Sequence, residues 1–205
     1  MNKKIIQCLA EKLQSANVGE VIIAGSGAML FYDEVTCPKL RNTDIDLIIK
    51  SATFDEYKRI VNVILDIDGI YPSVTYSSRL VCLEYNGVKV DIIPSETDIL
   101  GLNNSWFKHV FEIKPYAELT CHVAVIDSTL FIASKIEAAI DQVNNQLFHS
   151  KHKSDVIQIL NHVPLKFTEG SVQSKSIYDF IYNGLKTLEL DPVEYLQSNY
   201  EVNVA

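Results

Sequence analysis

Hydrophobic residues follow two different periods along the chain, and the alternation between them predicts an α/β fold. Helical spacing of apolar residues predicts helices at 3–16, 27–34, 54–66, 128–144, 154–162, 173–188 and 192–199. Short apolar or alternating runs predict strands at 20–24, 44–50, 72–76, 79–85, 88–94, 110–113 and 121–126. The fold class expected from this order is α/β (α+β), with a mixed sheet flanked by helices.

Two local signals sharpen this prediction. Thr53 precedes a helix with two acids in its first turn, which is a typical helix start. Asn86-Gly87 stands between two strand-like runs and is a strong signal for a tight hairpin. This hairpin would bring Asp91 into the sheet. Residues 95–109 are expected to form a loop with at most a short helix.

Acidic residues interrupt the predicted strands at particular positions. Asp44 and Asp46 flank Ile45 on one strand, and Asp91 lies between Val90 and Ile92 on another. Side chains alternate faces along a strand, so the first two acids should point the same way, about 6 to 7 Å apart. Three carboxylates at one place repel one another unless cations neutralise them.

Mg²⁺, or Mn²⁺, suits such a cluster because it prefers oxygen ligands and shares them with substrate phosphates. We therefore expect Asp44, Asp46 and Asp91 to be metal ligands and catalytic residues. In a two-metal displacement, one ion activates the attacking oxygen and the other steadies the triphosphate. Asp91 is the candidate that helps to deprotonate the acceptor.

Gly25-Ser26 follows the first strand and leads into a helix. Free backbone N–H groups at such a turn bind phosphate, glycine permits close approach, and the Ser26 hydroxyl can donate a further hydrogen bond. Each signal is weak alone, because Gly-Ser-Gly is more often a plain turn and an Asp-x-Asp pair is often a solvated edge. Their order along one chain is much harder to obtain by chance.

With these residues in place, the chain resembles the AbiEii-like (AbiEii/AbiGii toxin) family in the polymerase-beta-type nucleotidyltransferase superfamily. The likeness covers roughly residues 20 to 165 and includes the segment from Arg41 to Asp46, Lys89-Val-Asp-Ile-Ile-Pro and Phe131-Ile-Ala-Ser-Lys. It implies a nucleotide site that includes Arg41, Thr43, Lys135 and Asp155. One departure is His152, where relatives often carry an acid.

The same resemblance implies an activity. A nucleoside monophosphate would pass from a nucleoside triphosphate to a hydroxyl acceptor, which is expected to be RNA such as tRNA, in an enzyme of toxin–antitoxin type with a cognate antitoxin. It also implies two regions, a catalytic core at 1–127 and a helical part at 128–205 that closes the nucleotide site. Small-molecule (aminoglycoside-type) or protein acceptors, and a non-catalytic nucleotide-binding or interaction module, remain alternatives.

Two residues of the implied site, Lys135 and Asp155, also have purely structural explanations. Lys135 lies in an apolar helical stripe, where a lysine is more commonly a snorkelling surface residue than a phosphate ligand. Asp155 lies near a helix start, where the helix dipole favours an acid for structural reasons alone. The family resemblance favours the phosphate role for Lys135 and leaves the two readings of Asp155 equal.

The composition of the chain limits the classes of partner that it can bind. The chain has 205 residues, 47% of them hydrophobic and 21% charged, with a net charge of −8. Nucleic-acid binders usually display a basic face, so only a local patch at Lys151 and Lys153 could bind RNA. A cationic small acceptor would suit the negative net charge of the chain. No run approaches the roughly 18 apolar residues of a membrane span, and Met1-Asn-Lys-Lys begins an amphipathic helix, so we expect a cytoplasmic protein without a membrane partner.

Overall fold

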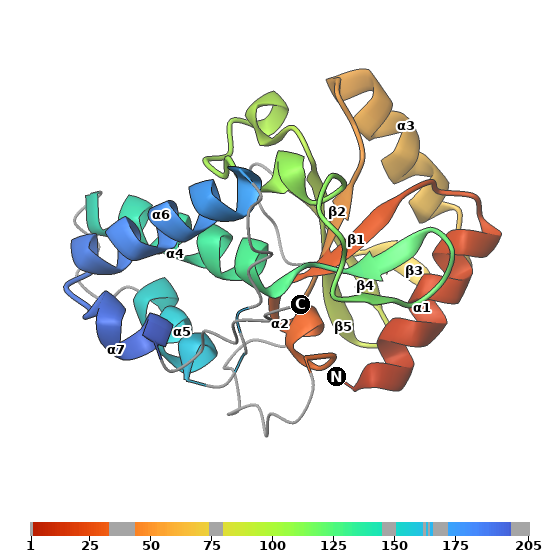
Figure 1. Cartoon of the computed structure of the whole chain (residues 1–205). Helices are drawn as coiled ribbons and strands as arrows, with labels where there is room; N and C mark the ends of the chain where they lie inside the picture. Colours follow the sequence, from red (N-terminus) through yellow and green to blue (C-terminus); the bar gives the residue numbers. More distant parts are fainter. Residues whose placement is uncertain are drawn as a thin grey trace. The chain divides into compact units, whose positions relative to one another are not determined.

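The chain divides into two compact units, which separate between Asp127 and Ser128. The computed structural model describes residues 2–32, 44–73, 80–144, 151–161, 163, 165 and 172–197. A sheet with its helices makes up the first unit, and helices make up the second (Figure 1).

A seven-stranded mixed sheet forms the centre of the first unit, in the order β3-β4-β5-β2-β1-β7-β6. Its strands are β1 (Val21–Ala24), β2 (Ile45–Ile49), β3 (Ile70–Pro72), β4 (Val81–Tyr85), β5 (Val88–Pro94), β6 (Ala117–Glu118) and β7 (Val123–Val125). The β2–β5 and β1–β7 pairs are parallel, and the remaining pairs are antiparallel. This fold class matches the one predicted from the sequence.

The helices of the first unit are α1 (Lys3–Ser15), α2 (Gly25–Met29) and α3 (Phe54–Leu65), with short 3-10 helices η1 (Thr97–Leu100) and η2 (Phe107–His109). Both α1 and α3 bury the apolar residues of one face. Asn2 caps α1 and Thr53 caps α3, each through its side-chain oxygen. A methyl group placed on Gly27 would touch Ile6 of α1, Ile23 and Ile45 at 3.4 to 3.6 Å, so α1 covers the face on which Ile45 lies.

The second unit contains the remaining helices, α4 (Ser128–Asn144), α5 (Lys151–Leu160), α6 (Val172–Thr187) and α7 (Pro192–Gln197). Both α5 and α6 pack against α4. Gly184 permits the α4–α6 contact, since a Cβ at this position would overlap the Cγ2 methyl of Ile136. Pro192 opens α7, where its missing N–H costs nothing.

The predicted hairpin is confirmed, because Asn86 and Gly87 have φ angles of 50° and 72° and join β4 to β5. The predicted strand at 110–113 is wrong. Residues there continue in turns after η2, since the N–H groups of Glu112 and Ile113 donate to the carbonyl of His109 at 3.1 and 3.3 Å. The strand that precedes β7 along the chain is β6, which pairs with β7 in an antiparallel manner.

The helix predicted at 27–34 is shorter and begins earlier, at Gly25, with no residue between it and β1. Its expected last residues lie outside the described part of the chain. Among the described residues, no helix is long and apolar enough to span a membrane.

Candidate metal and nucleotide site

Three carboxylates meet in the first unit where the two central parallel strands pair. Asp46 on β2 is the direct register partner of Asp91 on β5, and Asp44 immediately precedes β2. One oxygen from each of the three carboxylates lies within 4.8 Å of the others. Among the described residues, this is the only group of three or more His, Cys, Asp or Glu side chains that could hold a metal ion.

The pleat of β2 explains how acids can stand in the middle of an apolar sheet. Ile45 and Leu47 are fully buried on one face, while Asp44 and Asp46 are partly exposed on the other. Asp91 is only 6% exposed, which makes it the most deeply buried of the three acids. A buried carboxylate is costly unless hydrogen bonds, counter-ions or a metal stabilise its charge.

Gly25 makes room for Asp46. Ala24 pairs with Asp46 across β1 and β2, so the next residue lies against that side chain. A Cβ at position 25 would lie 2.7 Å from Asp46 Cγ and closer still to Oδ2, and the φ angle of Gly25 is 62°. Only glycine satisfies both conditions without displacement. The sequence pointed to a phosphate at this glycine, but the packing against Asp46 was not foreseen.

Ser26 is engaged with the acidic cluster. Its hydroxyl lies 2.8 Å from the Asp44 carbonyl oxygen and 3.0 Å from Asp44 Oδ1. A hydroxyl carries one proton, which it donates to one of these oxygens at a time. Ser26 thereby ties the start of α2 to the residue that precedes β2, and a phosphate bound here would compete for that proton.

Lys89 belongs to this cluster, although the sequence did not single it out. Its Nζ donates to Asp91 Oδ2 at 2.6 Å from the same face of β5. Burial lowers the pKa of the Lys89 ammonium, but the hydrogen bond and charge of Asp91, helped by Asp44, outweigh this effect and raise the pKa overall. The spacing of two residues between Lys89 and Asp91 was the only sequence signal for this pair.

The other Asp91 oxygen suggests what the cluster lacks. Asp91 Oδ1 is buried and has no hydrogen-bond partner among the described residues, although buried polar oxygens are nearly always paired. A hard divalent cation bound by carboxylate oxygens would satisfy it, so the donor set fits Mg²⁺ or Mn²⁺.

The remaining predicted residues are elsewhere or undescribed. Arg41 and Thr43 lie outside the described residues. Lys135 on α4 and Asp155 on α5 belong to the second unit, where Lys135 Nζ and Asp155 Oδ2 are 4.0 Å apart. His152 Nδ1 lies at the same distance from Asp155 Oδ2. Lys135 also lies 5.7 Å from the ring centroid of Phe131, so this lysine bridges an acid and an aromatic face within its own unit.

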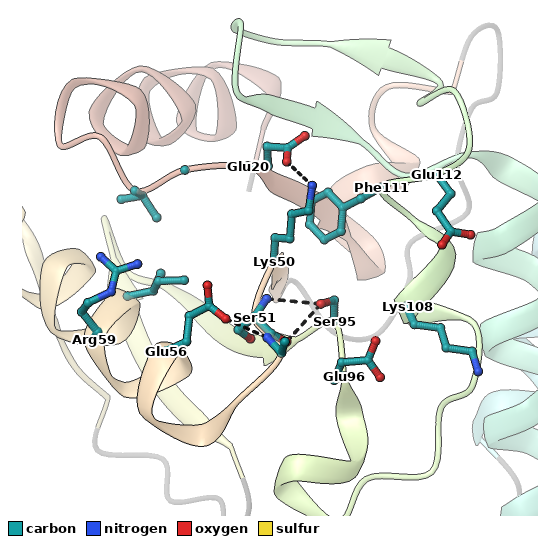
Figure 2. A pocket seen from close by; sticks show the side chains of 14 residues that line it. Glu20, Lys50, Ser51, Glu56, Arg59, Ser95, Glu96, Lys108, Phe111 and Glu112 are labelled. Carbon is teal, nitrogen blue, oxygen red and sulfur yellow. Dashed lines mark hydrogen bonds and ion pairs between the residues drawn. The ribbon is translucent and has the colours of Figure 1, made fainter.

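A separate pocket opens in the first unit beyond the other end of β2. Its volume is about 640 Å³, and Figure 2 shows charged side chains of both signs around it. Lys50, which follows β2, donates to Glu20 at 2.5 Å and lies 5.6 Å from the ring centroid of Phe111. Lys50 lies four positions after Asp46, about 13 Å at the rise of a strand, so this pocket is not the acidic site.

Comparison with known proteins finds a similar fold among solved structures and no match among family models or curated proteins. No protein-family model matches the chain, and no curated protein matches it significantly. Among solved structures, an antigenic nucleotidyltransferase-like protein from Paracoccidioides brasiliensis is similar, with a TM-score of 0.50 and 15% identity over 95% of this chain and 96% of that one. The chain therefore has a nucleotidyltransferase-like fold, whereas the AbiEii-like family is not confirmed.

Proposed function

We propose that the protein is a metal-dependent nucleotidyltransferase that moves a nucleoside monophosphate from a nucleoside triphosphate to a hydroxyl acceptor. The observation that carries this proposal is the acidic cluster of Asp44, Asp46 and Asp91, with its unpartnered Asp91 oxygen, in a nucleotidyltransferase-like fold. The buried Asp91 Oδ1 is costly to leave without a partner in the middle of a sheet, and a bound metal ion would supply that partner.

In the proposed reaction, the acceptor oxygen bonds to the α-phosphorus of the triphosphate and the bond from that phosphorus to the β-phosphate oxygen breaks. Pyrophosphate leaves, and the hydroxyl proton passes to Asp91. Asp44, Asp46 and Asp91 would hold Mg²⁺ or Mn²⁺, which when bound supplies positive charge to the phosphates and to the attacking oxygen. The Gly25-Ser26 turn would bind phosphate through backbone N–H groups.

We also propose that Lys135, Asp155, Arg41 and Thr43 take part in nucleotide binding. Support for this role comes from the AbiEii-like resemblance and from the Lys135–Asp155 proximity within the second unit. We propose that Lys135 exchanges this contact for the triphosphate, a stronger anion, when nucleotide is bound.

RNA, such as tRNA, is the proposed acceptor, in an enzyme of toxin–antitoxin type that would have a cognate antitoxin. The AbiEii-like resemblance supports it, together with two lysines, Lys151 and Lys153, at the start of α5. A second candidate is a cationic small molecule of aminoglycoside type, favoured by the net charge of −8, which repels a phosphate backbone and attracts a cation.

The test is incubation of the protein with each labelled triphosphate, Mg²⁺ or Mn²⁺, and separate pools of total RNA, protein and cationic antibiotics. Label on RNA supports the proposal as stated. Label on antibiotic alone or on protein alone would show that this class of molecule, and not RNA, is the acceptor. Asp44→Asn with Asp46→Asn should reduce transfer by about 10³-fold or more, because Asn keeps the shape but removes the charge that holds the metal.

The Asn variant also tests whether the acids serve structure. Its stability without metal should equal or slightly exceed that of the unaltered chain, because like charges have been removed. A variant that cannot fold, or one that transfers label normally, would contradict the assignment of these acids.

A further inference from the structure

Lys89 places a positive charge where a metal ion would need to bind. Its ammonium is 2.6 Å from Asp91 Oδ2, and Asp91 has little access to other cations because it is only 6% exposed. Asp91 thus offers one oxygen to the lysine, while its second oxygen has no partner among the described residues.

Lys89 also changes the net charge of the cluster. Three ionised carboxylates and one ammonium leave a net charge of −2, so the ammonium offsets one third of the acidic charge. A divalent cation attracted to the same carboxylates would be repelled by the ammonium at short range and would find Asp91 Oδ2 already engaged.

We propose that Lys89 is a built-in counter-ion of the acidic cluster, which a divalent cation must displace from Asp91 before it can bind with full affinity. This inference rests on the proposed function, since it assumes that the cluster holds a metal. Lys89 keeps Asp91 paired while the site is empty, which avoids the cost of an isolated buried carboxylate.

The side chain of Lys89 is suited to such an exchange. It is 34% exposed, and lysine carries a compact, well-hydrated charge on a flexible stem, so the released ammonium can return to water or meet an entering phosphate. Metal alone should therefore bind weakly. Metal that arrives with a triphosphate should bind better, because the phosphates supply the negative charge that compensates the lysine.

The experiment measures by calorimetry how tightly the full chain binds Mn²⁺ from MnCl₂, and compares the unaltered protein with two variants. All titrations are made at constant ionic strength and without nucleotide. Lys89→Gln removes the charge but keeps an N–H donor for Asp91. It should bind Mn²⁺ about tenfold more tightly, equivalent to ~1.4 kcal/mol. Lys50→Gln is the matched control, because Lys50 loses the same charge and an ion pair at the far end of β2. Its Mn²⁺ affinity should stay within about twofold of the unaltered chain.

The outcomes separate this inference from the proposed function. Mn²⁺ binding by the unaltered chain with equal or weaker binding by Lys89→Gln would overturn the counter-ion role and leave the metal site standing. No binding by either protein would overturn both. Binding by Lys89→Gln alone would support the role strongly. Thermal melts across a MnCl₂ series give the same comparison, and a variant still unfolded at saturating MnCl₂ would make Lys89 structural and overturn the proposal.

Discussion

Gly25 and Asp46 lie so close together that each limits what the other position can hold. The glycine occupies a left-handed backbone conformation beside the carboxylate, at the junction of β1 and α2. This contact joins the turn expected to bind phosphate to an acid expected to bind metal. A small change on one side should therefore be felt on the other.

Gly25→Ala should lower the free energy of unfolding by at least about 1–2 kcal/mol, the cost of a left-handed non-glycine residue, and should weaken metal binding by displacing Asp46. Denaturant unfolding and Mn²⁺ titration measure the two effects. Gly27→Ala is the matched control, because its Cβ would meet neighbours only at ordinary distances of 3.4 to 3.6 Å. Equal stability of the two variants would show that the Asp46 contact does not constrain position 25.

At the scale of residues, the sequence foretold which acids meet but not what else they touch. Alternation along β2 places Asp44 and Asp46 on one face, and this depends only on local geometry. The contacts of Gly25 with Asp46 and of Ser26 with Asp44 depend on how β1 and α2 pack against β2, across a long interval of chain. Lys89 could equally have turned to solvent, so its spacing from Asp91 did not predict the ion pair.

At the scale of elements, one buried phenol adds a hydrogen bond to the apolar packing of α3 on the sheet. Tyr57 is 2% exposed, and its hydroxyl donates to the carbonyl oxygen of Ile92 on β5 at 2.9 Å. Burial raises the pKa of Tyr57 from 10.0 to about 12. The folded state therefore keeps a proton that the unfolded state loses first as the pH rises.

Tyr57→Phe should cost about 1 kcal/mol of stability at neutral pH through the lost hydrogen bond. The stability contributed by the protonated phenol is present below about pH 10 and is lost between about pH 10 and 12, so the variant should lose stability less steeply in that window. Denaturant unfolding at several pH values measures both effects. Tyr71→Phe, which alters a side chain that is 62% exposed, is the control at neutral pH. An unchanged alkaline slope in Tyr57→Phe would contradict the argument.

In the second unit, the contact between α4 and α6 depends on Gly184. Gly184→Ala should destabilise this unit by about 1–3 kcal/mol through overlap with Ile136, although alanine is the better helix former by about 1 kcal/mol. Ile136→Ala should also destabilise it, by leaving a cavity. The double variant should lose less than the sum of the two, and a purely additive result in denaturant unfolding would contradict direct packing.

The sequence predicted whether a segment is a helix or a strand better than it predicted the first and last residues of that segment. Long periodic segments such as α1 and α3 could be predicted because their apolar stripes repeat over several turns. The run at 110–113 could not, because four residues satisfy either period, and local hydrogen bonds to His109 decided in favour of turns. The start of α2 also escaped prediction, since the helix begins directly on the strand at a glycine.

At the scale of the whole molecule, ligand binding should appear as stability. If Mg²⁺ or Mn²⁺ with a triphosphate binds only the folded chain, a hundredfold excess over Kd should add about 2.7 kcal/mol to the free energy of unfolding. Thermal melts with metal and each triphosphate measure this shift. Asp44→Asn with Asp46→Asn should abolish it. The absence of a shift with every triphosphate would contradict the nucleotide site.

The residue-for-residue pairing of Asp46 with Asp91 has a consequence for the lifetime of the protein. Strands β2 and β5 are neighbours in the sheet, but the chain between them runs through α3, β3 and β4. An ion bound by both acids would link the two ends of this long loop. The two strands could then separate only after the ion is released. Resistance to digestion by proteases would then follow the supply of divalent cation, so a cell short of magnesium would degrade this protein faster.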